Sequence, residues 1–414
     1  MKKRGKLIYL IIFLLILSSF IVFCEKILHG EIKSATPIST NNLSTNTFDD
    51  RNPSTSYSMP KVFIGNTRKV VKIPAMPEEG FYWSYYLSIP SNKYSLENEH
   101  YKKYLLVESN NTGATESIEE VEREVEKNSI EMNRTVFHIG ENLTIPVLIP
   151  AFPRLHLGYY YNGEKNFFNT HSLDRDTMML ETNLQDNKLR KSLTDKFLDR
   201  GFDIETLRNI DQQLIAMVNH AINYLNHNGF NLENDKIFLN GYSASGSFAN
   251  RFSYLHPEMI KAVACGATLD DMMLPISTYK HKDLIYPIGI YDYKEITGKD
   301  FDLNSFNSVA RLIFMGEDDY KNTLSFVDCF GARERKIILS LWGESILPRA
   351  KTLTSLYGES DGNGILILDR GIQHSKSVEM TNYLINFFKS NRNTYKPFYP
   401  TPSDPSQLKY AMYI

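Results

Sequence analysis

The sequence is poor in cysteine and has none of the cysteine spacings that hold a metal. Its 414 residues include three cysteines, Cys24, Cys265 and Cys329, and no C-x-x-C pair. Metal sites and redox motifs built on such pairs are therefore absent, and we expect no metal centre. Only Cys265 and Cys329 would lie in an exported domain, where two buried thiols are favoured over a single disulfide.

The sequence also lacks an excess of charge of either sign. Lysine and arginine number 46, aspartate and glutamate number 48, and the net charge is −2. Because nucleic-acid-binding proteins usually carry a basic face and a high isoelectric point, this balance argues against a nucleic-acid partner. No internal repeat is visible. With 42% hydrophobic residues, the chain can bury a sizeable core in one large domain or two ordinary ones.

The N-terminus contains a long uncharged apolar run. Residues 7–23 are apolar or small and follow the basic stretch MKKRGK. A run of this length is typical of a signal peptide or a membrane anchor, and either one exports the rest of the chain. No small-x-small cleavage site follows directly, and Phe23 is bulky for the position before a lipidated Cys24. We expect residues 1–24 to be a signal peptide or an anchor, which would make the protein secreted or membrane-bound at the cell surface.

Residues 25–59 are rich in Ser, Thr, Asn and Pro, a composition that cannot bury enough apolar surface to order itself. We expect a disordered tether there and one folded domain over residues 60–414. In that domain short apolar runs alternate with segments of helical periodicity. The runs include residues 143–153, 235–241, 260–267, 310–315 and 364–369, and the helical segments include residues 115–132, 204–229, 243–256 and 377–390. This alternation predicts an α/β fold whose mostly parallel sheet has helices on both faces, with the ligand site at the carboxyl ends of the strands.

Ser243 follows one of these apolar runs, in the sequence Gly241-Tyr242-Ser243-Ala244-Ser245. A nucleophile turn of the G-x-S-x-G kind needs small residues two positions before and after the serine, and here Ser245 replaces the second glycine. The pattern alone is weak, and a Gly/Ser-rich loop is the alternative. Between a predicted strand and a predicted helix it favours Ser243 as a nucleophile. The backbone N–H of Ala244 would then lie at a helix N-terminus and stabilise an oxyanion.

An acid and a histidine follow two later strands in the order that a catalytic triad requires. The run at 310–315 leads into Gly-Glu-Asp-Asp, where both Asp318 and Asp319 qualify. We select Asp319, because the acid often falls on the third residue after such a glycine. His374 follows the last predicted strand and precedes a closing helix. The predicted triad is therefore Ser243, Asp319 and His374.

The second oxyanion donor is expected in the loop after the strand near residue 105. The backbone N–H of Asn110 or Asn111 is the candidate, with a plain turn as the alternative. A long polar insertion, residues 155–202, would form a lid or substrate wall, or only a surface insertion. The candidates for lining the substrate cleft are Tyr242, His171 and Phe152.

Together these motifs resemble the α/β-hydrolase superfamily over about residues 80–390. The resemblance rests on GYSAS, GEDD and GIQH, and it is closer to bacterial exported serine esterases of the polyhydroxyalkanoate-depolymerase-like and feruloyl-esterase-like groups, where GxSASG, FANRF and HPE are familiar. It implies that residues 60–414 are an α/β-hydrolase catalytic domain. It further implies acyl transfer from a small-molecule or polymeric ester to water, without a cofactor. There is no HGGG-type oxyanion motif, and NNTG stands in its place.

Two other classes of protein stay open at this point. A serine peptidase of the same fold would share the triad, although residues 60–80 are too few for the large gating domain that such peptidases often carry. A catalytically inactive module that binds at the cell surface has no need to keep all three residues of the triad.

Overall fold

The computed structural model covers the region predicted to be the catalytic domain. It describes residues 61–64, 68–90, 101–111, 117–132, 134–154, 158–161, 164–167, 169–198, 202–326 and 329–413. The predicted signal peptide or anchor, residues 1–24, and the predicted tether, residues 25–59, lie outside the described residues. Within the ranges just given, no helix is both long enough and apolar enough to span a bilayer.

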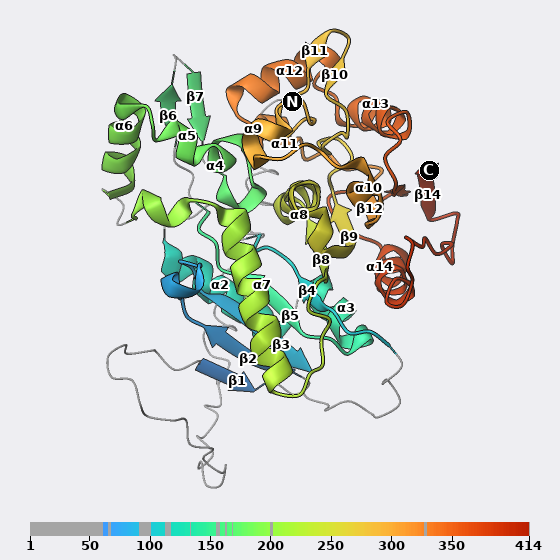
Figure 1. The fold of residues 1–414 in the computed structure, drawn as a ribbon. Helices are drawn as coiled ribbons and strands as arrows, with labels where there is room; N and C mark the ends of the chain where they lie inside the picture. The colour runs from blue at the N-terminus through green and yellow to red at the C-terminus, as the bar shows by residue number, and fades with distance from the viewer. Residues whose placement is uncertain are drawn as a thin grey trace, which may run out of the picture. The chain divides into compact units, whose positions relative to one another are not determined.

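A ten-stranded sheet forms the centre of this domain, in the spatial order β1-β2-β3-β5-β4-β8-β9-β12-β13-β14 (Figure 1). The strands are β1 (Lys61–Ile64), β2 (Arg68–Ile73), β3 (Tyr85–Pro90), β4 (Leu105–Val107), β5 (Val147–Pro150), β8 (Ile237–Tyr242), β9 (Ile260–Gly266), β12 (Ala310–Gly316), β13 (Ile365–Asp369) and β14 (Leu408–Tyr413). The strands from β5 through β4, β8, β9 and β12 to β13 are parallel. The outer strands β1, β2, β3 and β14 pair antiparallel. The predicted mostly parallel sheet is confirmed, and the carboxyl ends of the parallel strands share one edge.

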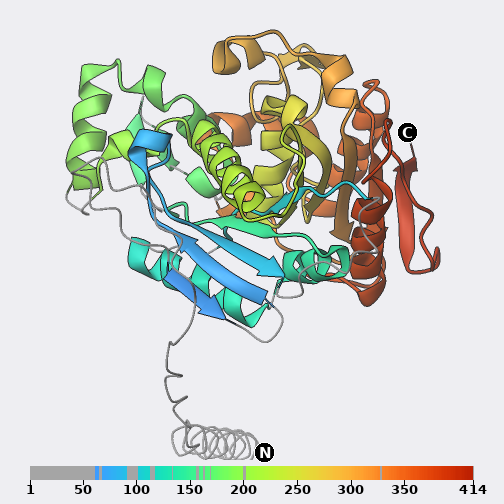
Figure 2. The ribbon, with the colours of Figure 1, turned by 60° about the horizontal axis from the view of Figure 1, so that its bottom comes forward.

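Helices cover both faces of the sheet, because successive strand residues point to opposite sides. On one face, α2 (Ile118–Glu131), α3 (Thr135–Leu143) and α14 (Val378–Ser390) pack against Leu106, Phe238 and Leu312. On the other face, α7 (Ile210–His227), α8 (Ala244–Leu255) and α13 (Ile346–Gly358) pack against Leu105, Leu239 and Ile313. In Figure 2 the teal helices α2 and α3 and the lime helix α7 lie on opposite sides of the strands.

Shorter elements fill the connections. They are the hairpins β6 (Gly158–Tyr161)/β7 (Glu164–Phe167) and β10 (Thr278–Tyr279)/β11 (Lys282–Asp283), the 3-10 turns η1 (Pro77–Glu79), η3 (Thr170–Ser172), η4 (Ile204–Leu207) and η5 (Pro257–Met259), and the helices α4 (Arg175–Met178), α5 (Leu180–Asn183), α6 (Asn187–Leu198), α9 (Tyr293–Thr297), α10 (Leu303–Asn307), α11 (Thr323–Phe326) and α12 (Ala332–Trp342). The described part of the insertion predicted over 155–202 therefore contains a hairpin, a 3-10 turn and three helices.

A long helix was predicted over 204–229, and its predicted start is wrong. Only η4 forms before Asn209, whose backbone is left-handed with φ 51°, and α7 begins at the next residue. The break is stabilised from within α7, because Gln213 Nε2 donates hydrogen bonds of 2.9 Å to the carbonyl oxygens of Thr206 and of Arg208. These two carbonyl oxygens are bonded by a side chain instead of by backbone N–H groups of a continuous helix. The spacing of apolar residues does not reveal such a replacement.

The two cysteines of the described region remain thiols, as predicted. Cys265 lies on β9 and Cys329 lies before α12, and both are buried without a disulfide. Burial raises the pKa of the Cys265 thiol to about 12, because the thiolate would lose its hydration. This thiol is therefore protonated and unreactive at neutral pH.

The close approach of α8 to β9 can be tested at Gly246. A β-carbon on Gly246 would lie 2.3 Å from the carbonyl oxygen of Gly266, a backbone atom that cannot move cheaply. We expect Gly246→Ala to lower the free energy of unfolding by about 2–3 kcal/mol, as overpacking of a core does. Urea unfolding followed by circular dichroism measures it. Gly364→Ala is the control, because its β-carbon would come no nearer than 3.3 Å to any atom; an equal loss in both variants would contradict the prediction.

Candidate active site

Ser243 lies in the turn between β8 and α8, at the carboxyl edge of the sheet. Its backbone has φ 60° and ψ −128°, a strained combination for a residue with a side chain. Two hydrogen bonds hold it there. Ser243 N donates to the carbonyl oxygen of Gly266 in β9 at 2.9 Å, and Ser247 N donates to the carbonyl oxygen of Ser243 at 3.0 Å. The strain is thus supported on one side by the sheet and on the other by the first turn of α8.

The small residues around Ser243 are required by the sharpness of the turn. A β-carbon on Gly241 would lie 2.0 Å from the carbonyl oxygen of Ser245. Ser245 contributes more than the small size expected of it. Its Oγ accepts a hydrogen bond from Tyr242 N and donates one to Tyr242 O, both at 2.9 Å. The hydroxyl at this position therefore closes the turn in a way that glycine could not.

The acid and the histidine meet at the ends of β12 and β13. His374 Nδ1 lies 2.8 Å from Asp319 Oδ2, and the side chains are 13% and 3% exposed. The other carboxylate oxygen, Asp319 Oδ1, accepts a hydrogen bond of 2.9 Å from Lys321 N. Asp318 is exposed and contacts the histidine loop through its backbone, donating from N to the carbonyl oxygen of Ile372 at 2.9 Å.

The turn of Ser243 follows a central parallel strand, and the loops of Asp319 and His374 follow later parallel strands at the same edge. The chain has the α/β-hydrolase fold.

The loop after β4 reaches the nucleophile turn through asparagine side chains. Asn111 Nδ2 donates to the carbonyl oxygen of Tyr242 at 3.0 Å, and Asn110 Nδ2 donates to the carbonyl oxygen of Phe152 at 2.8 Å. Glu108, at the start of the loop, pairs with Arg134 and accepts a hydrogen bond from Asn240. The loop is therefore fixed beside Ser243, as a second oxyanion donor requires. Residues 112 and 113 of the NNTG stretch lie outside the described residues.

The three candidates for lining the cleft are in different surroundings. The ring of Tyr242 lies 5.3 Å from that of His374. Phe152 is buried and stacks on Phe248 of α8, with ring centroids 6.2 Å apart. His171 is buried in η3, which packs on α8. Tyr242 thus lies next to His374, whereas Phe152 and the turn that contains His171 pack against α8. The side chains of the hairpin β6/β7 lie outside the described residues.

Comparison with known proteins found likenesses of structure only. No family model matches the chain, and no curated protein sequence matches it. A poly(3-hydroxybutyrate) depolymerase from Bordetella parapertussis is 12% identical with a TM-score of 0.42, over 80% of this chain and 91% of the other. An S-formylglutathione hydrolase from Agrobacterium tumefaciens is 12% identical with a TM-score of 0.38, over 80% and 97%. A ferulic acid esterase from Anaeromyces mucronatus is 11% identical with a TM-score of 0.36, over 85% and 97%.

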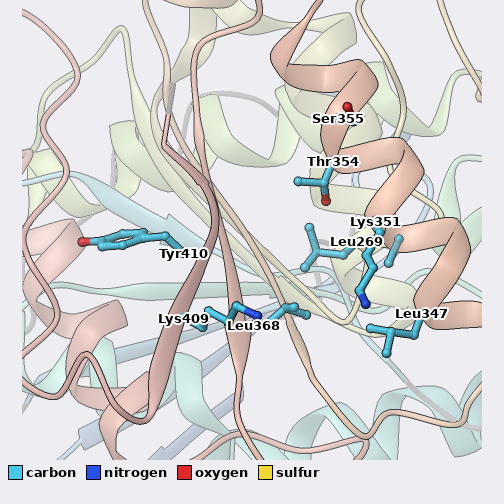
Figure 3. Close-up of a pocket in the computed structure, with 9 residues that line it drawn as sticks. Leu269, Leu347, Lys351, Thr354, Ser355, Leu368, Lys409 and Tyr410 are labelled. Atoms are coloured by element: carbon cyan, nitrogen blue, oxygen red, sulfur yellow. The ribbon is translucent and has the colours of Figure 1, made fainter.

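A cavity of about 310 Å³ lies elsewhere in this α/β-hydrolase domain (Figure 3). One wall is a face of α13 that includes Leu347, Lys351 and Thr354, and the other includes Leu368 of β13 and Lys409 of β14. The cavity contains none of Ser243, Asp319 and His374 in its lining. In Figure 3 the ring of Tyr410 points away from the other labelled side chains.

A buried polar network beneath the site escaped the sequence analysis. Arg349 of α13 donates to Asp270 Oδ2 at 2.7 Å and to Asn322 Oδ1 at 2.9 Å. It thereby ties the loop after β9 to the loop that carries Asp319. The next residue, Asp271, accepts a hydrogen bond of 3.1 Å from Ser247 Oγ. The adjacent aspartates, separated by two residues from the predicted strand at 260–267, were the signal available in the sequence. Arg349 lies 79 residues from its partner Asp270, and no feature of the sequence around it indicated this contact.

In the part of the chain that the structure describes, metal-binding side chains do not gather around this network. Among the described residues, no group of three or more His, Cys, Asp or Glu is arranged to hold a metal ion.

Asp271 is the member of the network whose charge is poorly compensated. Its side chain is buried, and its Oδ1 accepts no hydrogen bond from the described residues. Burial, followed by the neighbouring charge of Asp270, raises the pKa of Asp271 to about 7. The folded state therefore favours the protonated form. The contribution of Asp271 to the free energy of unfolding therefore decreases as the pH rises from the usual pKa of an aspartate, about 4, towards 7.

Replacing Asp271 by asparagine should therefore stabilise the protein in a pH-dependent way. Because one pKa unit corresponds to about 1.4 kcal/mol, we expect the gain from Asp271→Asn to grow to roughly 2–4 kcal/mol between pH 4 and pH 7 and then to level off. Chemical unfolding at a series of pH values measures it. Asp270→Asn is the matched control and should destabilise, because it leaves Arg349 buried without its carboxylate. A gain independent of pH would contradict the account.

Proposed function

We propose that this protein is a serine hydrolase that cleaves carboxylic esters through an acyl-enzyme intermediate. The single observation that carries the proposal is the 2.8 Å contact between Asp319 and His374, at the same sheet edge as the strained turn of Ser243. A nucleophile, a base and a group that orients the base are the minimum that acyl transfer by serine requires. A further proposal, which rests on residues 1–24 alone, is that the enzyme acts outside the cell, secreted or anchored at the surface.

The reaction would begin with attack of Ser243 Oγ on the ester carbonyl carbon. His374 Nε2 takes the hydroxyl proton as the new C–O bond forms, while Asp319 accepts the hydrogen bond from Nδ1–H and so fixes the tautomer. The tetrahedral intermediate then expels the alcohol, which leaves with the proton held on His374. Water attacks the acyl-enzyme by the same steps in reverse, releasing the carboxylic acid and restoring Ser243.

The negative oxygen of the tetrahedral intermediate would be bound at the N-terminus of α8. The backbone N–H of Ala244 is the first donor, and the dipole of this twelve-residue helix adds to its effect. A backbone N–H of Asn110 or Asn111 is the second donor. The Asn111–Tyr242 hydrogen bond supports this choice, because it holds that loop against the turn. One such donor is worth about 3–4 kcal/mol of barrier.

Removal of the nucleophile tests the proposal. Ser243→Ala should lower kcat for short aryl esters at least about a thousandfold, since no other group takes over the attack. The thermal midpoint should stay near that of the wild type. Ser340→Ala, at an exposed position of α12, is the control and should keep its activity. Residual activity of Ser243→Ala above a tenth of the wild-type value would rule out this serine.

The two neighbouring acids give a second test. Asp319→Asn should lower kcat by about 10³–10⁴-fold, because the histidine tautomer is no longer fixed. Asp318→Asn should change it less than about threefold, because its exposed side chain makes no contact with His374 among the described residues. Steady-state kinetics on the same ester compares them, and equal losses in the two variants would contradict the assignment of the acid.

The other classes of protein are separated by a fluorophosphonate probe and a substrate panel. The panel contains short acyl esters, a polyester, a feruloylated sugar and a peptide amide. Labelling with ester turnover and no amide turnover supports the esterase. Amide turnover of comparable efficiency would favour a peptidase, and absence of labelling would favour a binding module.

A further inference from the structure

We propose that Tyr242 and Lys376 form a clamp that holds the His374 loop against the nucleophile turn, and that both are positioning residues for the reaction. The proposal rests on the function proposed above. It assigns to Tyr242 a role different from the cleft-lining role predicted from the sequence, and it adds Lys376, two residues after His374.

The first part of the clamp is a hydrogen bond between two chain neighbours of the catalytic residues. Tyr242 Oη donates to the carbonyl oxygen of Ser375 at 2.9 Å. Tyr242 directly precedes Ser243, and Ser375 directly follows His374. One bond therefore joins the end of β8, directly before the nucleophile, to the loop that carries the base, across 133 residues of sequence.

The second part of the clamp is the aromatic ring of Tyr242. The ring of His374 lies 5.3 Å from it at an interplanar angle of 57°, and Lys376 Nζ lies 3.6 Å from its centroid. The ring of Phe314, in β12, lies 6.1 Å away. An ammonium group over an aromatic face is attracted by the quadrupole of the ring, most strongly where water is excluded. The loop is thus held on Tyr242 at His374, at Ser375 and at Lys376.

Below about pH 8 both side chains carry the proton that the clamp needs, and above it the lysine half of the clamp weakens. Burial lowers the pKa of Lys376 to about 8, with Glu108 opposing the shift and Arg134 adding to it. Among the described residues, no carboxylate forms a salt bridge with the Lys376 ammonium. Burial, with the charges of Asp319 and Asp369, raises the pKa of Tyr242, so its hydroxyl stays protonated and can donate.

The clamp acts between two points where the histidine loop is already fixed. At one end Asp318 N donates to Ile372 O at 2.9 Å, and at the other Ser377 N donates to Asp369 Oδ2 at 2.8 Å. His374 lies between them. Tyr242 packs against the core on the α14 face of the sheet, in the same cluster as Phe238. Its own position is therefore fixed, and it can hold the part of the loop around His374 in place. Small displacements of a catalytic base are costly, since about 1 Å can reduce the rate about a hundredfold.

The test uses the full-length protein and four variants. Tyr242→Phe removes only the hydroxyl, and Lys376→Met removes only the charge. Each should lower kcat roughly five- to tenfold with KM unchanged, the loss expected for one interaction of this kind. Lys376→Arg should restore most of the loss, because it keeps a cation for the ring. Tyr242→Leu should lower kcat more than either, and adding Lys376→Met to it should cost nothing further, since the lysine acts through the ring.

Two exposed residues of the same types serve as controls. Tyr395→Phe and Lys389→Met lie away from the loop and should leave kcat and KM unchanged. An increase in KM at constant kcat in Tyr242→Phe would overturn the clamp and return Tyr242 to the substrate cleft. The clamp would also be overturned if Tyr242→Phe and Lys376→Met both fold and both keep the kcat of the wild type.

A measurement without substrate keeps this test separate from the proposed function. The His374 Nδ1–H proton, hydrogen-bonded to Asp319, should give a downfield proton resonance in the wild type and in Lys389→Met. In Tyr242→Leu this resonance should broaden or disappear, because the loop is released. An unchanged resonance would overturn the clamp even if the protein hydrolysed no ester. The wild type could show the expected resonance and yet not be labelled by a fluorophosphonate. That result would overturn the proposed function and leave the clamp standing.

Discussion

The site depends on the strained backbone of Ser243. A residue with φ 60° and ψ −128° is stable only where its surroundings leave no alternative, and here they are built for that purpose. The carbonyl oxygen of Gly266 in β9 receives the Ser243 N–H, the Ser245 hydroxyl closes the turn, and Gly241 leaves room for it. This constraint requires β8, α8 and β9 to lie very close together. The sheet supplies that closeness, and it places the turn of Ser243 at the edge where the other loops begin.

The remaining parts of the site are positioned by bonds between loops rather than by any one element. Asp318 N and Asp369 hold the two ends of the histidine loop. Arg349 ties the loop after β9 to the one that carries Asp319. Asn111 ties the loop after β4 to the turn of Ser243. The parallel strands β4, β8, β9, β12 and β13 thus each contribute a loop to the edge, and hydrogen bonds between these loops fix their mutual distances. Preorganisation of this kind is what acyl transfer needs, because the charges of the transition state then meet dipoles already in place.

Local pattern was sufficient to predict the sheet, and insufficient to predict the contacts that join its loops. The apolar runs before Ser243, Asp319 and His374 predicted strands with a common edge, and β8, β12 and β13 are where those runs lie. The choice of Asp319 over Asp318 stays a prediction that the 2.8 Å contact with His374 supports. The break at Asn209 was missed, because the periodicity of 204–229 continues through it and only the side chain of Gln213 explains it. The Arg349–Asp270 pair and the Tyr242–Ser375 bond join residues 79 and 133 positions apart, and no local signal encodes such pairs.

The central claim is that Ser243 attacks an acyl carbon while its oxyanion is held at the N-terminus of α8. The most direct measurement is a crystal structure of the full chain after inactivation by a fluorophosphonate, whose phosphorus mimics the tetrahedral carbon. The account predicts a covalent bond from Ser243 Oγ to phosphorus. It also predicts a phosphoryl oxygen about 2.7–3.1 Å from Ala244 N, the range of a working oxyanion donor. A phosphoryl group attached to another residue, or an oxygen turned away from α8, would contradict it.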